Sequence, residues 1–148
     1  MINQVLPATI NNEYKGHKLA LYVFYLITVM TVGRSLVHMF ATDGGAQSIA
    51  TIPLDSYSTP AAQTVILIFA LWGLSQLTMG VFYVIIIFRY KSLIPLMYIF
   101  LFIEYAMRLV MMYMKPIITE ETAPGATGNY IFIPLSIVMF ILSMRKRS

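Results

Sequence analysis

The sequence predicts an all-α fold, a polytopic membrane protein that forms a bundle of four transmembrane helices. Of its 148 residues, 59% are hydrophobic and 11% are charged, whereas soluble domains carry about a quarter charged residues. A helix that crosses a bilayer needs about 20 apolar residues, so a chain of this length has room for about four. These proportions exclude a single soluble domain and predict one membrane domain over residues 1–148.

Four apolar runs supply the predicted helices. None shows the alternation of apolar and polar residues that a barrel strand requires, and only helices or closed barrels satisfy the backbone inside a bilayer. The fourth run has about 15 residues and is short for a hydrocarbon core of about 30 Å, so it must start earlier, thin the bilayer or rely on snorkelling basic residues. The helices are expected at about 19–40, 63–88, 92–114 and 130–144.

Basic residues outside the runs predict the orientation. Seven of them flank one side of the expected membrane: Lys15, Lys18, Arg89, Lys91, Arg145, Lys146 and Arg147. The other side has only Lys115, accompanied by four acidic residues. Because cytoplasmic loops are rich in Lys and Arg, both termini are expected in the cytoplasm, with the chain in the cell inner (plasma) membrane.

This placement explains part of the net charge of +4 and argues against a nucleic-acid partner. The cluster at 145–147 acts as a stop signal or binds anionic lipid headgroups. The first run is longer than the 7 to 15 residues of a signal-peptide core, so we expect it to remain as a membrane helix.

Two connections lie on the expected outer side. The longer one, 41–62, begins with Asp43 and two glycines, which suit a cap and a turn, and then places apolar residues at helical spacing. It forms either a short helix at the interface or over the bundle, or an ordinary polar loop. The second connection, 115–129, contains Pro124-Gly125 and Gly128-Asn129, which are turn signals, and is expected to be exposed.

Ionisable side chains inside the runs are few and not scattered. Arg34 and His38 are four residues apart, as are Glu104 and Arg108, so each pair shares a helix face. Both arginines fall about 9 Å below the outer edge of the core, at 1.5 Å per residue. Polar groups at such depth are expensive and indicate a site. The predicted ligand-binding residues are Arg34, His38, Trp72, Gln76, Glu104 and Arg108.

Two interpretations of these residues remain open. In one, Glu104 forms a buried ion pair with Arg108 or Arg34 that fixes helix register. In the other, the residues form a pocket. With His38 neutral, the group carries two positive charges and one negative charge, so a second anion is expected nearby. The candidates are Asp43 at the mouth, Asp55 in the overlying loop, or an anionic ligand.

The pattern of residues gives little support for a bound metal or cofactor. The chain has no cysteine, which excludes disulfides and thiolate ligands. There is no HxxxH motif, and His17 and His38 would lie over about 30 Å apart on one continuous helix, too far for shared haem ligation. We therefore expect no metal site and no resident cofactor, and no catalytic residue can be assigned.

Three short motifs carry a resemblance to a known group. They are GRSLVHMF at 33–40, ALWGLSQLTMG at 70–80 and EYAMRLV at 104–110. Together with the long outer loop, they resemble the DoxX-like family of small four-helix membrane proteins over about residues 19–144. The glycine and lysine that usually follow the histidine in that family are absent, and Met39 and Phe40 stand after His38. The resemblance implies the fold and suggests a link to oxidoreductase or thiol-stress systems.

Three functions therefore compete. The first is a pocket that binds an anionic or amphipathic small molecule or lipid. The second is a membrane oxidoreductase, or a subunit of a redox complex, acting on a quinone-like substrate, so enzyme activity is undecided. The third is an oligomeric channel or transporter. The pocket is the favoured interpretation, with membrane lipid as a partner and assembly into a homo-oligomer or larger complex left open.

Overall fold

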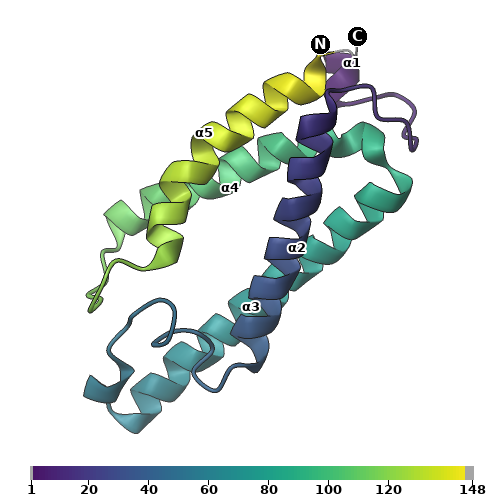
Figure 1. Ribbon diagram of the computed structural model, residues 1–148. Coiled ribbons are helices and arrows are strands. Elements are labelled where there is room, and N and C mark those ends of the chain that lie inside the picture. Colours follow the sequence, from purple (N-terminus) through teal and green to yellow (C-terminus); the bar gives the residue numbers. More distant parts are fainter. Residues whose placement is uncertain (1, 146–148) are drawn as a thin grey trace.

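The structure is a computed structural model that describes residues 2–145, and these residues form an all-α fold (Figure 1). Four helices are long and apolar enough to cross a membrane, which confirms the predicted fold class. The elements are α1 (Ile2–Val5), α2 (Lys18–Phe40), the 3-10 helix η1 (Leu54–Ser56), α3 (Thr59–Arg89), the 3-10 helix η2 (Lys91–Leu93), α4 (Ile94–Met114) and α5 (Pro124–Met144).

The fourth spanning helix starts before its apolar run, which is one of the three alternatives expected for that short run. It begins at Pro124, six residues before the expected start. Proline is favoured in the first turn of a helix, because its missing N–H would have no partner there. The expected turns at Pro124-Gly125 and Gly128-Asn129 are therefore wrong, since both lie inside α5. Its 21 residues span about 31 Å, which removes the shortfall in length.

The helices are arranged as two pairs. Helix α2 packs along α3, α4 packs along α5, and α2 also meets α5. Helix α1 and the last turn of α5 lie together at one end of the bundle (Figure 1), which we call the terminus end; the turn between α3 and α4 lies there too. The opposite end carries the 41–58 and 115–123 connections, and we call it the loop end.

The core fills the half of the bundle next to the terminus end. Phe24 of α2 lies at its centre, with its ring centroid 5.3 Å from that of Tyr83 on α3 and 5.9 Å from that of Tyr98 on α4. The hydroxyl of Tyr98 donates to the carbonyl of Ala20, which joins α4 to α2. This half is therefore packed by apolar and aromatic side chains from every spanning helix: Ala20, Phe24, Ile27, Tyr83, Ile86, Ile94, Met97, Tyr98, Leu101, Tyr105 and Met139.

Two glycines on α3 allow α2 to approach closely. A Cβ atom at Gly73 would lie 2.7 Å from the Cβ of His38, and one at Gly80 would lie 2.9 Å from Cγ2 of Val32. Both distances are shorter than any ordinary carbon–carbon contact. Small residues at such positions are a common device for packing membrane helices, and here they set the spacing of the α2/α3 pair.

The long 41–58 connection folds back onto α3 without forming an α-helix. Residues 42–50 form consecutive turns, and the only helical piece within this stretch is η1. Of the two alternatives expected, a short helix or an ordinary polar loop, neither describes this connection fully: its helical piece is the 3-10 helix η1, and other parts of it are buried. Ala46, Ile52 and Leu54 are buried, and they pack against Val65, Ile66 and Phe69, among other residues. These contacts give the loop end a small apolar core of its own.

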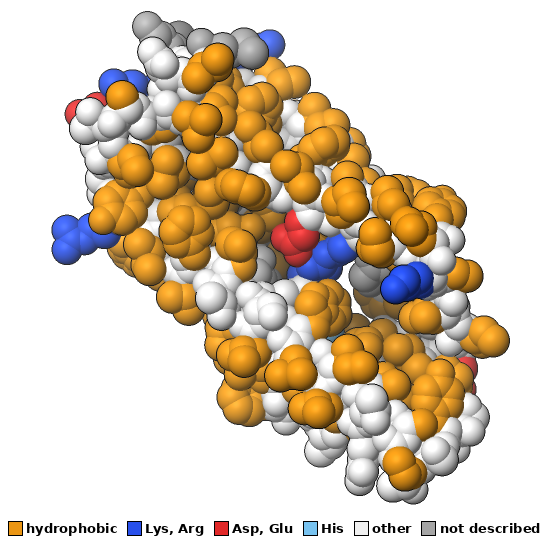
Figure 2. Space-filling view, turned by 180° about the vertical axis from the view of Figure 1, so that it is seen from behind, with side chains coloured by type: hydrophobic (Ala, Val, Ile, Leu, Met, Phe, Trp, Pro, Cys, Tyr) orange, Lys and Arg blue, Asp and Glu red, His pale blue; other side chains and the backbone are white. Residues whose placement is uncertain are grey.

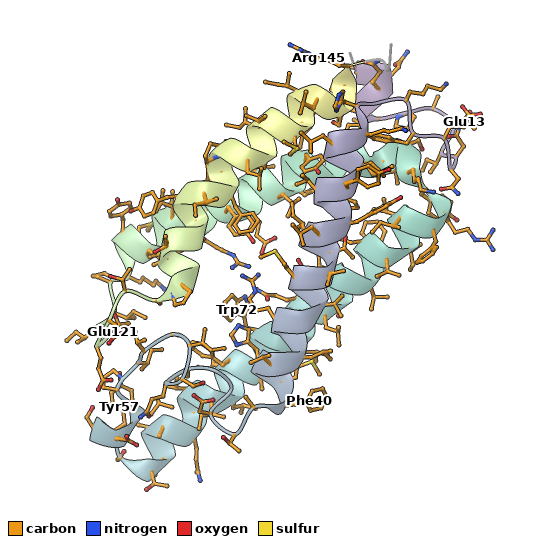
Figure 3. All side chains as sticks on the ribbon, in the orientation of Figure 1. Glu13, Phe40, Tyr57, Trp72, Glu121 and Arg145 are labelled. Carbon is orange, nitrogen blue, oxygen red and sulfur yellow. The ribbon has the colours of Figure 1, made fainter. Side chains whose placement is uncertain are left out.

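Thr51 links the two loops at the loop end. Its backbone carbonyl accepts a hydrogen bond from the N–H of Glu120 at 2.9 Å, and its hydroxyl donates to the carbonyl of Glu121 at 2.8 Å. Figure 3 shows Glu121 beside the 41–58 loop. Thr51 has a φ of 55°, a left-handed conformation that costs a β-branched residue of order 1–3 kcal/mol. The surrounding contacts must hold it there, so Thr51 joins the two helix pairs across the loop end.

The segment before α2 covers the terminus end. The N–H of Asn11 donates to Oγ of Ser92 at 3.1 Å, and Oγ of Ser92 donates to the carbonyl of Asn11 at 2.9 Å. The N–H of His17 donates to the carbonyl of Leu142 at 3.1 Å. Tyr14 belongs to this segment and packs against the core, and its burial raises the pKa of its hydroxyl. The segment thus ties the α3–α4 turn to the end of α5.

Candidate functional site

Five of the six predicted site residues meet between the two helix pairs. They are Arg34 on α2, Trp72 and Gln76 on α3, and Glu104 and Arg108 on α4. Acidic and basic side chains are visible in a hollow surrounded by hydrophobic surface (Figure 2). The helix pairs are held together in the half that contains the core and leave space on the side toward the loop end, which is why the polar groups gather there.

Two cavities lie on either side of Arg34. The first, of about 190 Å³, is bounded by α2, α3 and α4. The second, of about 290 Å³, is bounded mainly by α2, with Tyr105 of α4 and Phe132 of α5. Thr31, Arg34 and Tyr105 line both, so the two cavities meet at these residues. The first is lined by Thr31, Arg34, Trp72, Ser75, Gln76, Met79, Leu101, Glu104 and Tyr105.

Arg34 is joined to α3 by a neutral partner. Its Nε donates to Oε1 of Gln76 at 3.2 Å. Gln76 is only 6% exposed, and within residues 2–145 its buried Nε2 has no hydrogen-bond partner. A buried donor without an acceptor costs about 1–3 kcal/mol. The structure therefore places an unused amide donor directly beside the Arg34 guanidinium.

Glu104 pairs with the arginine on its own helix. Its Oε1 accepts a hydrogen bond from the Nη2 of Arg108, four residues further along α4. This is one of the two ion pairs that the sequence predicted. The side chains of Glu104 and Arg108 are 39% and 21% exposed, so the pair lies at the opening of the hollow. No contact of this kind joins Glu104 to Arg34 within residues 2–145.

Trp72 brings both arginines to one aromatic ring. The Cζ of Arg34 lies 5.9 Å from the ring centroid of Trp72, and the Cζ of Arg108 lies 5.1 Å from it. Arg108 also lies 5.2 Å from the ring of Tyr105. Cations at these distances are attracted by the face of an aromatic ring. Trp72 lies in the space between the two helix pairs (Figure 3) and is 37% exposed, so a ligand in the hollow would touch its ring.

His38 lies behind Trp72 and lines neither cavity. It is 3% exposed, and its ring centroid is 4.8 Å from that of Trp72 and 5.6 Å from that of Phe69. Its Nδ1 lies 2.8 Å from the carbonyl oxygen of Gly44, so Nδ1 carries the hydrogen. His38 thus anchors the start of the 41–58 loop and supports Trp72, and its expected contact with a ligand stays a prediction.

The two expected acidic neighbours are engaged within the loop. The carboxylate of Asp43 accepts from the backbone N–H groups of Gly45 at 2.8 Å, Gln47 at 3.1 Å and Ser48 at 2.6 Å. Burial acts to raise its pKa, but these hydrogen bonds outweigh burial and lower the pKa to about 2. Asp55 accepts from Nε2 of Gln47 at 2.7 Å.

The positive charge of Arg34 therefore lacks a carboxylate partner in the described part of the chain. The ion pairs among residues 2–145 are Lys15 with Glu13 and Arg108 with Glu104. Neither Asp43 nor Asp55 reaches an arginine of the hollow. Both loop carboxylates accept hydrogen bonds within the loop. Of the three candidates for the second anion, only a bound ligand is left.

Sequence reasoning missed Tyr105. This residue is 6% exposed, lines both cavities, and stacks on Phe132 with ring centroids 4.6 Å apart and an interplanar angle of 10°. It follows Glu104 directly and was counted only as part of an apolar run. The available signal was its spacing, since Leu101, Tyr105 and Arg108 recur at helical intervals along one face of α4.

Lys146 and Arg147 of the terminal basic cluster lie outside the described residues. Within residues 2–145, no group of three or more His, Asp or Glu side chains is placed to hold a metal ion. No protein family, curated protein or solved structure matches the chain.

Proposed function

We propose that this small membrane protein binds an anionic or amphipathic small molecule or lipid in the hollow between the α2/α3 and α4/α5 pairs. One observation carries the proposal: the Arg34 guanidinium, on a helix long and apolar enough to cross a membrane, lies beside two cavities without a carboxylate partner in residues 2–145. A charge placed there is costly unless it is paired or hydrated, so it marks a site of function.

The shape of the molecule supports a pocket rather than a conduit. Aromatic and aliphatic side chains fill the half next to the terminus end, so the hollow is closed toward that side. The hollow opens on the side of the bundle (Figure 2), the surface that lipid tails would surround. A ligand would therefore enter sideways from the bilayer, which favours an amphipathic molecule.

Orientation and family are part of the same proposal. The basic residues Lys15, Lys18, Arg89 and Lys91 lie toward the terminus end, while the loop end carries four of the acidic residues. By the positive-inside rule, this supports cytoplasmic termini in an inner (plasma) membrane. The likeness to the DoxX-like group rests on the three short motifs named above and is kept as a proposal.

Single cysteines test the orientation, because the chain contains none of its own. A cysteine at Ser48, in the exposed part of the loop end, should react with an impermeant maleimide added to intact cells. A cysteine at Lys15 should react only after lysis. The opposite pattern would invert the orientation and place the mouth of the hollow on the cytoplasmic side.

Native mass spectrometry of the purified protein tests binding. The wild-type protein is expected to retain a co-purified species, and Arg34→Ala and Arg108→Ala are expected to lose most of it. Arg89→Ala, which removes an exposed arginine far from the hollow, is the matched control and should retain it. An empty wild-type protein whose melting temperature does not respond to added amphipathic anions would overturn the proposal.

A further inference from the structure

We infer that the ligand is a single-chain amphipath with a carboxylate head, bound by the free N–H groups of Arg34 and the unused amide of Gln76. This inference rests on the proposed function and goes further by naming the chemical class of the ligand. Three independent features support it: the charge of the hollow, the geometry of its donors, and the size of the adjoining cavity.

The charge of the hollow matches a single negative charge. Arg108 and Glu104 neutralise each other as an ion pair, which leaves the one positive charge of Arg34. A monoanion brings the site to neutrality, whereas a phosphate monoester, close to dianionic at neutral pH, would leave an excess negative charge beside Glu104. In surroundings of low polarity, either imbalance is costly.

The donors suit a planar group with two acceptor oxygens. Arg34 uses Nε for its bond to Gln76, and its Nη atoms donate to no side chain or backbone group within residues 2–145. The Nε2 of Gln76 likewise has no acceptor in the described chain. Arg34 Nε already donates a hydrogen bond to the side-chain amide of Gln76. The unused N–H groups of the two side chains therefore lie next to each other. A carboxylate accepts from such paired donors through both oxygens.

The cavity on the other side of Arg34 suits one hydrocarbon chain. It measures about 290 Å³ and is lined, apart from Arg34 and Thr31, by Ile27, Met30, Gly33, Tyr105 and Phe132. A Cβ at Gly33 would find no other atom within 4 Å, so the wall next to Arg34 is open. Pockets for drug-sized ligands measure about 300–1,000 Å³, and this one lies just below that range. It leaves no room for a glycerol backbone with two acyl chains.

Trp72 provides a direct probe, because it is the only tryptophan of the chain and it lines the first cavity. Bromine quenches indole fluorescence on close approach. The protein in nanodiscs is titrated with dodecanoate carrying bromine either on the carbon next to the carboxylate or at the chain end, and with the matching brominated dodecanol. The chain has no cysteine that a bromo acid could alkylate.

The acid brominated near its head should quench Trp72 saturably and more strongly than the acid brominated at its end. Unbrominated dodecanoate should reverse the quenching. The alcohol should bind at least about tenfold more weakly, as expected from the loss of a charge-assisted hydrogen bond. Arg89→Ala should behave as wild type, which controls for the loss of an arginine outside the hollow, and quenching by probe dissolved in the bilayer is recognised because it does not saturate.

Gln76→Glu is the decisive variant because it is nearly isosteric and gives Arg34 a permanent counter-ion. It should fold and yet lose saturable quenching by the acid. Retention of wild-type binding in this variant would overturn the inference. Equal, saturable binding of alcohol and acid, or stronger competition by dodecyl phosphate than by dodecanoate, would also overturn it while leaving the proposed pocket intact. If no probe quenched Trp72 saturably, both this inference and the proposed pocket would be overturned.

Discussion

Arg34 and Gln76 are held together by one hydrogen bond, from Nε to Oε1 at 3.2 Å, that joins α2 to α3 beside the hollow. The bond satisfies one group on each side chain and leaves Arg34 without a carboxylate partner, and the amide nitrogen of Gln76 without a hydrogen-bond partner, among residues 2–145. The two arginines of the hollow thus differ: Arg108 has a counter-ion and Arg34 does not.

This difference predicts opposite effects on stability. In the ligand-free protein, Arg34→Met removes an uncompensated charge and should stabilise the fold by about 1–2 kcal/mol, after allowing for the lost hydrogen bond to Gln76. Arg108→Met leaves Glu104 without its partner and should destabilise the fold by about 1–3 kcal/mol. Unfolding of the delipidated protein in mild detergent measures both. A loss of stability in both variants would show that Arg34 is structurally compensated.

The close contact of α2 with α3 predicts a strong effect at Gly73. Gly73→Ala places a methyl group 2.7 Å from the Cβ of His38 and 3.0 Å from the carbonyl oxygen of Ser35, and overpacking of this kind costs about 1–3 kcal/mol. Gly33→Ala is the matched control on α2, because its added methyl group meets nothing within 4 Å. We expect a lower melting temperature for Gly73→Ala and an unchanged or higher one for Gly33→Ala. Equal melting temperatures would contradict the helix spacing described here.

The left-handed conformation of Thr51 predicts that glycine is tolerated better than valine. Thr51→Gly loses the hydroxyl bond to Glu121 but relieves the backbone strain, so the two effects should nearly cancel. Thr51→Val keeps the strain and loses the bond, and should destabilise the loop end by about 1 kcal/mol. Hydrogen exchange of the amides at 119–122 should be faster in Thr51→Val. Unchanged exchange in that variant would mean that Thr51 does not hold the loops together.

Asp43 predicts a loss of stability in acid. Its pKa in the folded chain is about 2, below the ordinary value of 3.8. The stabilisation of the fold by the ionised carboxylate of Asp43 is therefore complete above pH 3.8 and is lost as the pH falls toward about 2. Since the carboxylate is partly open to solvent, we expect about 1 kcal/mol. The difference in unfolding free energy between wild type and Asp43→Asn should shrink across this interval. A difference that is constant with pH would show that the carboxylate charge contributes nothing.

The four spans could be predicted because hydrophobicity is a local property of the chain. Three of the apolar runs are long enough to cross a bilayer wherever their neighbours lie, and the fourth reaches that length with the residues that precede it. The i,i+4 spacing likewise predicted that Glu104 and Arg108 share a face, and the structure pairs them. An earlier start for the fourth helix was one of the alternatives, but the residues at its start were assigned to a turn, because Pro124 and Gly125 suit a turn and a first helical turn equally well. Packing against α4 selected the helix.

Which polar side chains pair with one another depended on how each helix is rotated about its axis and on where the helices cross. The sequence of a single helix specifies neither. Packing of α2 against Gly73 turns His38 toward Gly44 and Trp72, away from the cavities. The same packing gives Arg34 an amide partner in place of Glu104. The sequence by itself thus determined that charged residues would be scarce and would lie within the spanning segments. Only the contacts between helices decided which charged side chain was left without a carboxylate partner, because pairing depends on distances of a few ångströms across separate elements.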